Sequence, residues 1–596
     1  MRDILISIVI LLVAFINTAQ AKQMHGLSMH GNAKYNADYT HLEYANPDAP
    51  KGGRIKHGVM GSFDSLNNHI INGTSAKGLE LIYDKLMARV WDEPFTLYGL
   101  VAESIDIPDD RSSITFHLRP EARFHDGKQM TVEDVIFSYE TYRKYGHPVR
   151  RRVYSLVNNV EKIDNLSVKF TFGDGYDPET ALILAMMPVL PKHYWEKNDV
   201  MRTTLEPPLG SGPYLIKSIE AGRKITYERV KDYWAKDLPI NKGHHNFDVI
   251  SYDYYRDDGV SLEAFKSGEY DLRREQDIKK WITGYDFAAI QNGAVKKEEL
   301  KHNRPEWVRS LIFNTRRFPF DNRKVREALI YAFDFEWINK NLFHNSFKRI
   351  NSFFPNSELA ATGVPIGNEL SLLKKYRGLL PEEVFMNAYV PPITKGTGPS
   401  GQRKNLRKAT TLLKEAGWVI KDSKLTHIET GRFFEFEILL SDPKDEKIAL
   451  EFIRVLKRLG INARVRTVSS AEFAGRLDGF DYDMTLFRWI NSLSPGNEQM
   501  NYWGSAAANL NGSRNYAGVR SSIVDEIADS IARAPTREDL VNRTHALDRV
   551  LTWGYYTIPL YYLGHDLVAY NTKLRHPDET PLYGMVVETW WQEKKK

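Results

Sequence analysis

Few residue patterns in this 596-residue sequence are typical of metal, thiol or nucleotide chemistry. It contains no cysteine, which excludes disulfides, thiolate metal ligands and cysteine nucleophiles. Two histidine pairs, His244 with His245 and His25 with His30, have no carboxylate or further histidine at a metal-binding spacing. We therefore expect these histidines to be solvated, and we expect no metal and no other cofactor.

A glycine-rich stretch at residues 396–401 satisfies the pattern GxGxxG. In a dinucleotide-binding fold a strand leads into this motif, but here Pro391 and Pro392 stand where the strand should be. We therefore interpret the stretch as a loop. The sequence lacks GxSxG, HExxH and a phosphate-binding GxxxxGK(S/T), and carboxylate separations cannot be read from it, so no enzyme class gains support.

The N-terminal 21 residues are typical of a secretory signal, with Arg2 before an apolar run, Ile4 to Ile16, and a small-x-small site at Ala19–Ala21. An uncleaved anchor is the alternative, but thirteen helical residues span about 20 Å against a hydrocarbon core of about 30 Å. We expect cleavage after Ala21, with no lipid anchor because no cysteine follows. The expected location is the periplasm.

The remaining chain is too long for a single core, so two or three lobes are expected. The 81 basic and 76 acidic residues give a net charge of +5 and are well interspersed, which is not typical of a nucleic-acid-binding protein. No later stretch is apolar enough to span a bilayer, so no membrane insertion is expected.

Helical and strand patterns alternate along the second half of the chain, which favours a mixed α/β fold. A strand pattern at 434–440, a helical stripe at 449–459 and a second strand pattern at 461–465 predict a βαβ unit. Residues 359–403, rich in Pro, Gly and polar side chains, predict an irregular surface excursion. Two further helical stripes are predicted at 323–333 and 406–416.

The stretch Thr115 to Val135, TFHLRPEARFHDGKQMTVEDV, carries the most information. It predicts a strand, a turn at Asp126–Gly127 and a helix that begins with Thr131 and Asp134 in a capping box. The same stretch closely resembles the central motif of family 5 extracellular solute-binding proteins, the receptors of peptide and nickel ABC importers.

Other motifs follow in the order of that family across nearly the whole chain. They are PLGSGPY (208–214), Arg229 with Tyr233–Trp234, AFKSGEYD (264–271), FNT (313–315), PFD (319–321), VREAL (325–329), TLLKEAGW (411–418) and LKRLGI (456–461). HGLS (25–28) and SPGNEQ (494–499) resemble the YejA-type subgroup, which is linked to oligopeptides and to the peptide-nucleotide antibiotic microcin C.

The resemblance implies the three-lobed periplasmic-binding-protein fold (type II, cluster C), with a discontinuous lobe I, an inserted lobe II and a hinged lobe III. After the signal at 1–21, the expected pieces are 22–65 (lobe I), 66–204 (lobe II), 205–305 (lobe I), 306–550 (lobe III) and 551–596 (lobe I).

Alignment with oligopeptide-binding relatives implies that Arg488 and Trp489 lie at the lobe III side of the cleft. Arg488 would pair with a ligand carboxylate or phosphate, and Trp489 would pack on an apolar part of the ligand. A surface arginine beside a core tryptophan is the alternative. Ser492 stands where relatives have the aspartate that binds the ligand ammonium, so Glu498 or Asp483 would have to substitute for it.

The remaining expected ligand contacts come from three segments: a polar loop, a lobe crossing and an aromatic strand end. They are Asn497 and Glu498, Asn72 and Thr74, and Tyr254, Tyr255 and Arg256. Because Ser492 and Asn72 replace acidic residues of relatives and Arg488 is basic, we expect an anionic ligand.

The expected function is a monomeric binding protein, not an enzyme, that delivers oligopeptides or peptide-like compounds of the microcin C type to an inner-membrane ABC permease with its ATPases. A receptor for murein peptides is the alternative within the binding class. A periplasmic peptide hydrolase or a chaperone is the alternative from another class.

Overall fold

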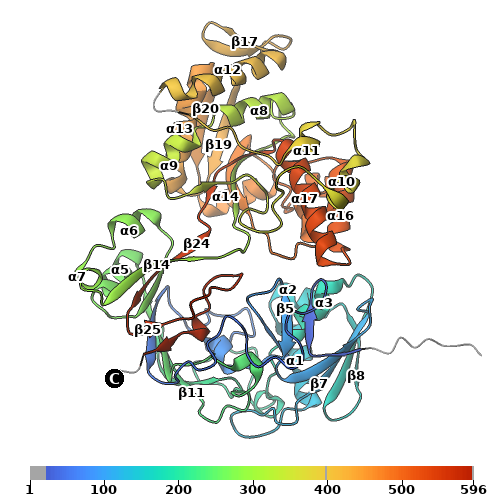
Figure 1. The fold of residues 1–596 in the computed structure, drawn as a ribbon, viewed down its shortest axis with the longest axis vertical. Coiled ribbons are helices and arrows are strands. Elements are labelled where there is room, and N and C mark those ends of the chain that lie inside the picture. The colour runs from blue at the N-terminus through green and yellow to red at the C-terminus, as the bar shows by residue number, and fades with distance from the viewer. Residues whose placement is uncertain (1–21, 396–398, 594–596) are drawn as a thin grey trace, which may run out of the picture.

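The computed structural model describes residues 22–395 and 399–593, so the predicted signal at 1–21 lies outside the described residues. The described chain forms three lobes. Two lie side by side below, and the third stands above them (Figure 1). Chain colours show that the lower left lobe, lobe I, combines early, middle and final segments, which confirms the predicted discontinuous lobe I.

Lobe I is built on a seven-stranded sheet within the described residues, in the order β10-β11-β12-β3-β13-β24-β14. Its strands are β3 (Arg54–Met60), β10 (Tyr214–Glu220), β11 (Lys224–Arg229), β12 (Val249–Tyr255), β13 (Leu272–Glu275), β14 (Val295–Lys301) and β24 (His565–Asn571). Other elements of lobe I are η2 (Pro239–Asn241), α5 (Asp258–Lys266), α6 (Ile278–Thr283), α7 (Ala288–Gln291), η6 (Val587–Thr589), and the pair β25 (Leu574–Arg575) and β26 (Trp591–Gln592).

Lobe II contains the predicted strand, turn and capped helix. The backbone N–H of Thr131 donates to the Asp134 carboxylate at 3.0 Å, which confirms the capping box. Its larger sheet has the order β1-β6-β7-β9-β8: β1 (Lys22–Met24), β6 (Ala102–Ile107), β7 (Ser113–Leu118), β9 (Ser167–Phe172) and β8 (Val157–Lys162). The other elements are β2 (Gly26–Ser28), β4 (Met87–Arg89), β5 (Thr96–Gly99), η1 (Leu79–Ile82), α1 (Val132–Tyr145), α2 (Pro148–Tyr154), α3 (Pro178–Ala185) and α4 (Lys192–Trp195).

Lobe III confirms the predicted βαβ unit, because β19 (Glu435–Leu440) and β20 (Asn462–Thr467) pair in parallel with α13 (Glu446–Leu456) between them. Its sheet has the order β20-β19-β21-β15-β22, with β21 (Met484–Trp489), β15 (Val308–Phe313) and β22 (Thr557–Pro559). Further elements are α8 (Arg323–Ala332), α9 (Phe335–Phe343), β16 (Lys348–Arg349), α10 (Gly367–Lys374), α11 (Glu383–Met386), α12 (Pro399–Glu415), β17 (Trp418–Lys421), β18 (Lys424–His427), η3 (Pro443–Asp445), η4 (Lys457–Leu459), α14 (Ser470–Asp478), α15 (Glu498–Trp503), η5 (Ser505–Asn509), α16 (Ser522–Ala532), α17 (Arg537–Trp553) and β23 (Tyr561–Tyr562).

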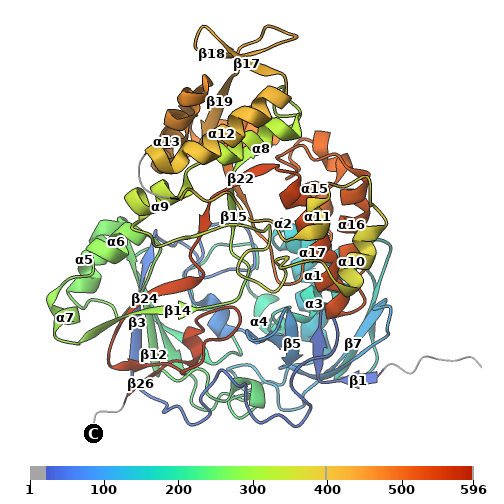
Figure 2. The same cartoon turned by 45° about the horizontal axis from the view of Figure 1, so that its top comes forward.

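The excursion at 359–403 is less irregular than its composition suggests. It contains the short helices α10 and α11 and the first turn of α12, and it crosses the front of lobe III in Figure 2. Buried contacts fix this excursion in place, and local sequence patterns do not predict them. Glu369 on α10 accepts from the buried guanidinium of Arg549 on α17, for example.

Two lobe boundaries differ from those expected. β1 and β2 pair with strands of lobe II, so residues 22–28 belong there rather than to lobe I. β22 pairs with β15 and β23 pairs with β16, so the chain leaves lobe III after residue 562 and not at 551. In both cases the segment pairs with a strand that is distant in the sequence, and this pairing assigns it to a different lobe from the one expected from its position along the chain.

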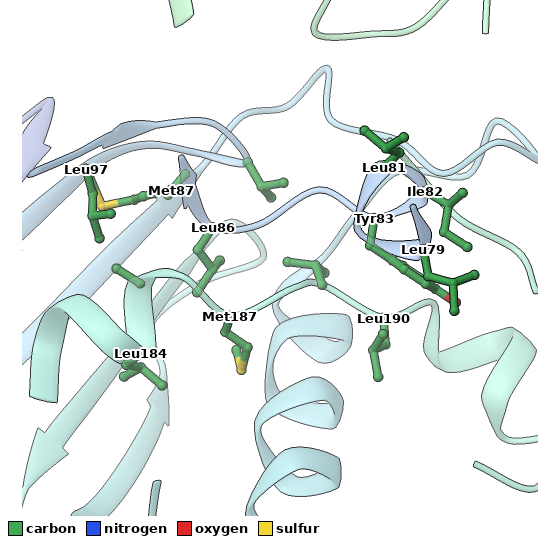
Figure 3. Packing of buried hydrophobic residues seen from close by; sticks show 14 of the residues in the cluster. Leu79, Leu81, Ile82, Tyr83, Leu86, Met87, Leu97, Leu184, Met187 and Leu190 are labelled. Carbon is green, nitrogen blue, oxygen red and sulfur yellow. The ribbon is translucent and has the colours of Figure 1, made fainter. Parts of the chain in front are cut away.

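Lobes I and II share one continuous hydrophobic core. It joins sheet residues of lobe I, such as Ile55 and Val568, to sheet residues of lobe II, such as Phe116. η1 and the segment around Leu86 and Met187 form part of this core (Figure 3). Gly210, in the predicted sharp turn, lies so close that a Cβ would overlap the carbonyl oxygen of Ile82, which explains glycine at this crossing.

Candidate ligand-binding site between the lobes

The topology brings several strand ends together where the chain passes between lobes I and III. β14 ends at Lys301 opposite His565, where β24 begins, and the parallel strands β3 and β12 end on the same side of the sheet. In lobe III, β15 begins beside the end of β21 because the two are antiparallel. The expected ligand residues at the ends of β12 and β21 therefore lie at the two sides of this crossing.

Arg488, near the end of β21, is exposed. Its guanidinium carbon lies 3.9 Å from the centroid of the Trp307 ring, and Trp307 is itself 49% exposed. Partial burial, together with the charge of neighbouring Arg309, lowers the pKa of Arg488. Within the described residues no ion pair engages Arg488, so the guanidinium is held on an aromatic face and its donors are available to an anion.

Trp489 lies in the core of lobe III, where its side chain is 1% exposed. Its Nε1 donates to the carbonyl of Arg514 at 3.0 Å, and its ring centroid is 4.7 Å from that of Trp503. In this conformation the indole supports β21 from behind. Ile490, the next residue, is 50% exposed, so the apolar side chain at the surface of this strand end is Ile490 and not Trp489.

The loop after β21 contacts lobe II. Ser492 is exposed, and its hydroxyl accepts from the backbone N–H of Ser494 at 3.1 Å. The side-chain amide of Asn497 donates to the Asp177 carboxylate at 2.8 Å, across 320 residues of sequence. This contact places the Asn497 loop at the junction of lobes II and III.

Glu498 adds a carboxylate to the same junction and accepts from the backbone N–H of Gly496 at 2.9 Å. Burial raises its pKa. Burial, and then the charges of Glu498 and Asp177, also raises the pKa of Glu179 to about 7. Sequence reasoning missed Asp177 and Glu179, although DPET (177–180) is recognisable as a helix-capping sequence. The junction is therefore more acidic than expected.

Asn72 and Thr74 lie exposed on one tight loop between lobes I and II. The backbone N–H of Thr74 donates to the Asp64 carboxylate at 2.6 Å. Gly73, between them, has φ of +77° and lies against the side chains of Asp64 and Thr203, so the loop conformation requires glycine.

The three residues expected at the end of β12 have different environments. The hydroxyl of Tyr254 accepts from the backbone N–H of Lys77 at 2.7 Å, which joins β12 to the segment after the Asn72 loop. Tyr255 is half-buried, and its ring centroid is 5.7 Å from that of Tyr270. Arg256, just beyond the strand, is exposed. Tyr254 is thus partly structural, whereas Arg256 is available to a ligand.

A buried carboxylate anchors the crossing itself. Asp566 on β24 is 4% exposed and is bound by Arg274 and by Arg304, the latter at 2.6 Å. Burial alone would raise the pKa of Asp566, but the Arg304 hydrogen bond and the Arg274 charge hold it below its usual value. Arg304 also donates to the carbonyl of Tyr583 at 2.6 Å and so ties the crossing to the C-terminal segment.

A cavity of about 290 Å³ lies next to this anchor, with walls mainly from lobe I and with η1 of lobe II at one side. Arg274 forms part of its wall, together with residues of β3, β12, η1 and the C-terminal segment: Ile55, His57, Leu81, Tyr214, His245, Phe247, Ile250, Tyr252, Met585, Val587 and Glu588. The expectation that His244 and His245 are solvated is wrong. His244 is buried and His245 is half-buried, and burial lowers the pKa of His244 to about 4 and holds the pKa of His245 well below its usual value.

In the described part of the chain, no group of three or more His, Asp or Glu side chains is arranged to hold a metal ion. None of the helices described here is both long enough and apolar enough to cross a membrane.

A three-lobed α/β chain with two crossings, and with charged and aromatic side chains gathered between them, defines a hinged solute-binding protein. The match to the model of the bacterial extracellular solute-binding proteins, family 5, covers residues 96–511. The chain belongs to this family, which consists of binding proteins and not of enzymes.

Full-length relatives support the YejA-type subgroup. The chain is 40% identical over 596 residues to the probable peptide-binding protein YejA of Agrobacterium fabrum, covering 98% of this chain and 97% of the relative. It is 41% identical over 594 residues to the peptidoglycan-binding protein YepA of the same organism, covering 97% and 96%. The oligopeptide-binding protein AppA of Bacillus subtilis, solved with a nonapeptide, shares the fold with a TM-score of 0.61 at 20% identity, covering 92% of this chain and 100% of AppA.

Proposed function

We propose that this protein captures oligopeptides or peptide-like compounds, including those of the microcin C type, between lobes I and III. It delivers them to an inner-membrane ABC permease with its ATPases. The observation that carries the proposal is the guanidinium of Arg488, exposed and held on Trp307 at the crossing. Such a group suits the free carboxylate or a phosphate of a peptide-like ligand.

Backbone recognition explains how one site accepts many peptides. Each ligand residue brings one donor and one acceptor, and both must be paired once water is excluded. Strand ends and loops that surround the crossing supply main-chain partners, while side chains of the ligand remain in wetter pockets. Closure of lobe III over the ligand then presents one closed surface to the permease.

Murein peptides are the second candidate ligand. The relative named as peptidoglycan-binding is 41% identical to this chain, much like the relative named as a probable peptide-binding protein. Both ligand classes have a peptide backbone and an anionic end, so both suit Arg488.

The location follows from the family and from the N-terminal sequence. We place the mature protein in the periplasm as an unlipidated monomer, cleaved after Ala21.

The test begins with native mass spectrometry of the protein purified from its own periplasm, and calorimetry then measures affinity for the peptides released. A ladder of peptide masses supports the peptide proposal, whereas an adduct with amino-sugar or diaminopimelate fragments supports the murein candidate. Arg488→Ala should weaken binding of free-acid peptides by roughly 10- to 100-fold, the loss expected for a charge-assisted hydrogen bond of about 1.5–3 kcal/mol.

Two controls make the test specific. Arg407→Ala removes an exposed arginine from the far face of lobe III, on α12, and should leave affinity unchanged. C-terminally amidated peptides should bind the wild type and Arg488→Ala equally. If the protein binds no peptide, or cleaves the peptides that are added, the receptor proposal fails.

A further inference from the structure

One carboxylate that lines the cavity, that of Glu588, has no side-chain partner. Glu588, on η6, is exposed to solvent and lines the cavity, and the atoms packed around its carboxyl group raise its pKa. Its backbone carbonyl accepts from the N–H of His245 at 2.8 Å, which fixes η6 against the cavity wall. Among the described residues, no side-chain hydrogen bond or ion pair engages the Glu588 carboxylate.

The walls around this carboxylate provide no free positive charge. Burial lowers the pKa of His57 to about 4, so His57 is neutral near pH 7, and its ring is stacked on Tyr252 with centroids 5.0 Å apart. His245 is also neutral, and its buried Nδ1 has no hydrogen-bond partner. The cation that does line the cavity, Arg274, is already bound to Asp566. The charge of Lys85 acts on Glu588 from outside the cavity lining, but among the described residues the two form no ion pair.

Charge and shape together define the ligand that this cavity suits. A carboxylate that lines a cavity without a side-chain partner favours a cation, and the tyrosine and phenylalanine faces favour an organic one. The volume of about 290 Å³ corresponds to roughly ten waters at about 30 Å³ each, enough for one long side chain.

Arg274 connects the cavity to the crossing. Arg274, 46% exposed and part of its wall, binds the Asp566 carboxylate that anchors the hinge. The wall strands β3 and β12 end on the side of the sheet where β24 begins.

We infer that this cavity binds a cationic side chain of the ligand, a primary ammonium or guanidinium group, against the carboxylate of Glu588. This inference rests on the proposed peptide function. It adds a second charge to the recognition, so that Arg488 takes an anionic end of the ligand and Glu588 takes a cationic group. The preferred ligands are then peptide-like compounds with both charges.

The experiment uses two probes with the full chain. The first is a set of tetra-alanine peptides with lysine, or the neutral isostere norleucine, at each of the four positions, measured by calorimetry. The second is n-butylammonium chloride, compared with sodium chloride at equal ionic strength and followed by thermal unfolding, which tests the cavity without any peptide. Each probe is applied to the wild type, Glu588→Gln, Glu588→Asp and the control Glu80→Gln, which removes an exposed carboxylate nearby.

The wild type should prefer lysine to norleucine by roughly tenfold in at least one position. Glu588→Gln should abolish that preference without weakening the norleucine peptide, Glu588→Asp should retain part of it, and Glu80→Gln should change it less than twofold. Butylammonium should raise the unfolding temperature of the wild type more than that of Glu588→Gln.

The inference is overturned if norleucine peptides bind the wild type as well as lysine peptides at every position, or if the preference persists in Glu588→Gln. If no peptide binds, the proposed function fails, and the butylammonium comparison decides the cavity alone: equal unfolding temperatures in butylammonium and sodium chloride overturn the cation site.

Discussion

Lobe I meets its two neighbours in different ways. Against lobe II it shares a single apolar core, in which sheet residues of both lobes pack together. Towards lobe III the chain passes through polar residues, with Arg304 on Asp566 and the Glu306 carboxylate accepting from the N–H of Gly564 at 3.0 Å. Lobe III has its main hydrophobic cores within its own residues, and its apolar contact with lobe I comes from partly buried side chains such as Phe343 and Phe347.

This difference indicates which interface moves. Separating lobes I and II would expose a large apolar area, at about 25 cal/mol per Å², so they behave as one body. Ion pairs and hydrogen bonds at the crossing exchange for water at little net cost, so lobe III turns there.

The largest effect is expected from breaking the shared core. Leu86→Ala removes a fully buried side chain between lobes I and II and should cost about 3 kcal/mol of unfolding free energy. Urea unfolding, followed by tryptophan fluorescence and by proteolysis of each lobe, measures it. Lobes I and II should be destabilised together, and separate losses would contradict a single body. Leu510→Ala, at a position 61% exposed, should change stability by less than about 0.5 kcal/mol.

A smaller effect is expected at the hinge. Asp566→Asn leaves Arg274 and Arg304 without their shared carboxylate and should cost about 1–3 kcal/mol near pH 7, because the two arginines are partly solvated. The pKa of Asp566 lies below its usual value in the folded protein, so its contribution is present at neutral pH and is lost as the pH falls through that pKa.

Stability measured at pH 7 and at pH 3 checks this sign, since the gap between wild type and variant should shrink at pH 3. Small-angle scattering should also report a wider spread of lobe III in the variant. Asp237→Asn, whose carboxylate is 82% exposed, should alter neither quantity.

The smallest effect concerns the contact of lobes II and III. Burial, and then the charges of Glu498 and Asp177, raises the pKa of Glu179 to about 7, while Arg89 opposes the shift. A carboxyl whose pKa is raised in a contact stabilises that contact when protonated, so the contact should weaken as the pH rises from 6 to 8. The closed population should fall by a few-fold.

Energy transfer between dyes on Lys197→Cys and Glu526→Cys measures this population, and the absence of native cysteine makes the labelling specific. Glu179→Gln should remove most of the pH dependence, whereas Glu196→Gln, an exposed carboxylate of the same lobe, should preserve it. A pH response unchanged in Glu179→Gln would show that another group controls the contact.

Local patterns in the sequence predicted those elements whose own residues determine them. The stripes of α8, α12 and α13, the strands β19 and β20, and the capped start of α1 follow from apolar spacing and from hydrogen bonds within a few residues. The three-lobed architecture came from the family resemblance, because a lobe assembled from three distant segments leaves no local signature.

The site was predictable by position but not by environment. Arg488 lies at the crossing as expected, yet whether Trp489 faces ligand or core depends on Trp503 and Phe353, which no local pattern connects to it. Likewise Asp177 meets Asn497 across 320 residues, and Glu588 enters a cavity whose other walls come from β3 and β12. These features depend on tertiary packing.

The position of β24 also bears on how the protein is made. This strand, residues 565–571, lies between β13 and β14 and pairs with both. β14 is at the edge of the sheet, so β24 is its single neighbour in the described sheet. Lobes II and III are complete earlier in the chain, but during synthesis the sheet of lobe I has two open edges until its last strand emerges. A chain cut short before residue 565 would keep those edges exposed, and unpaired strand edges are templates for aggregation.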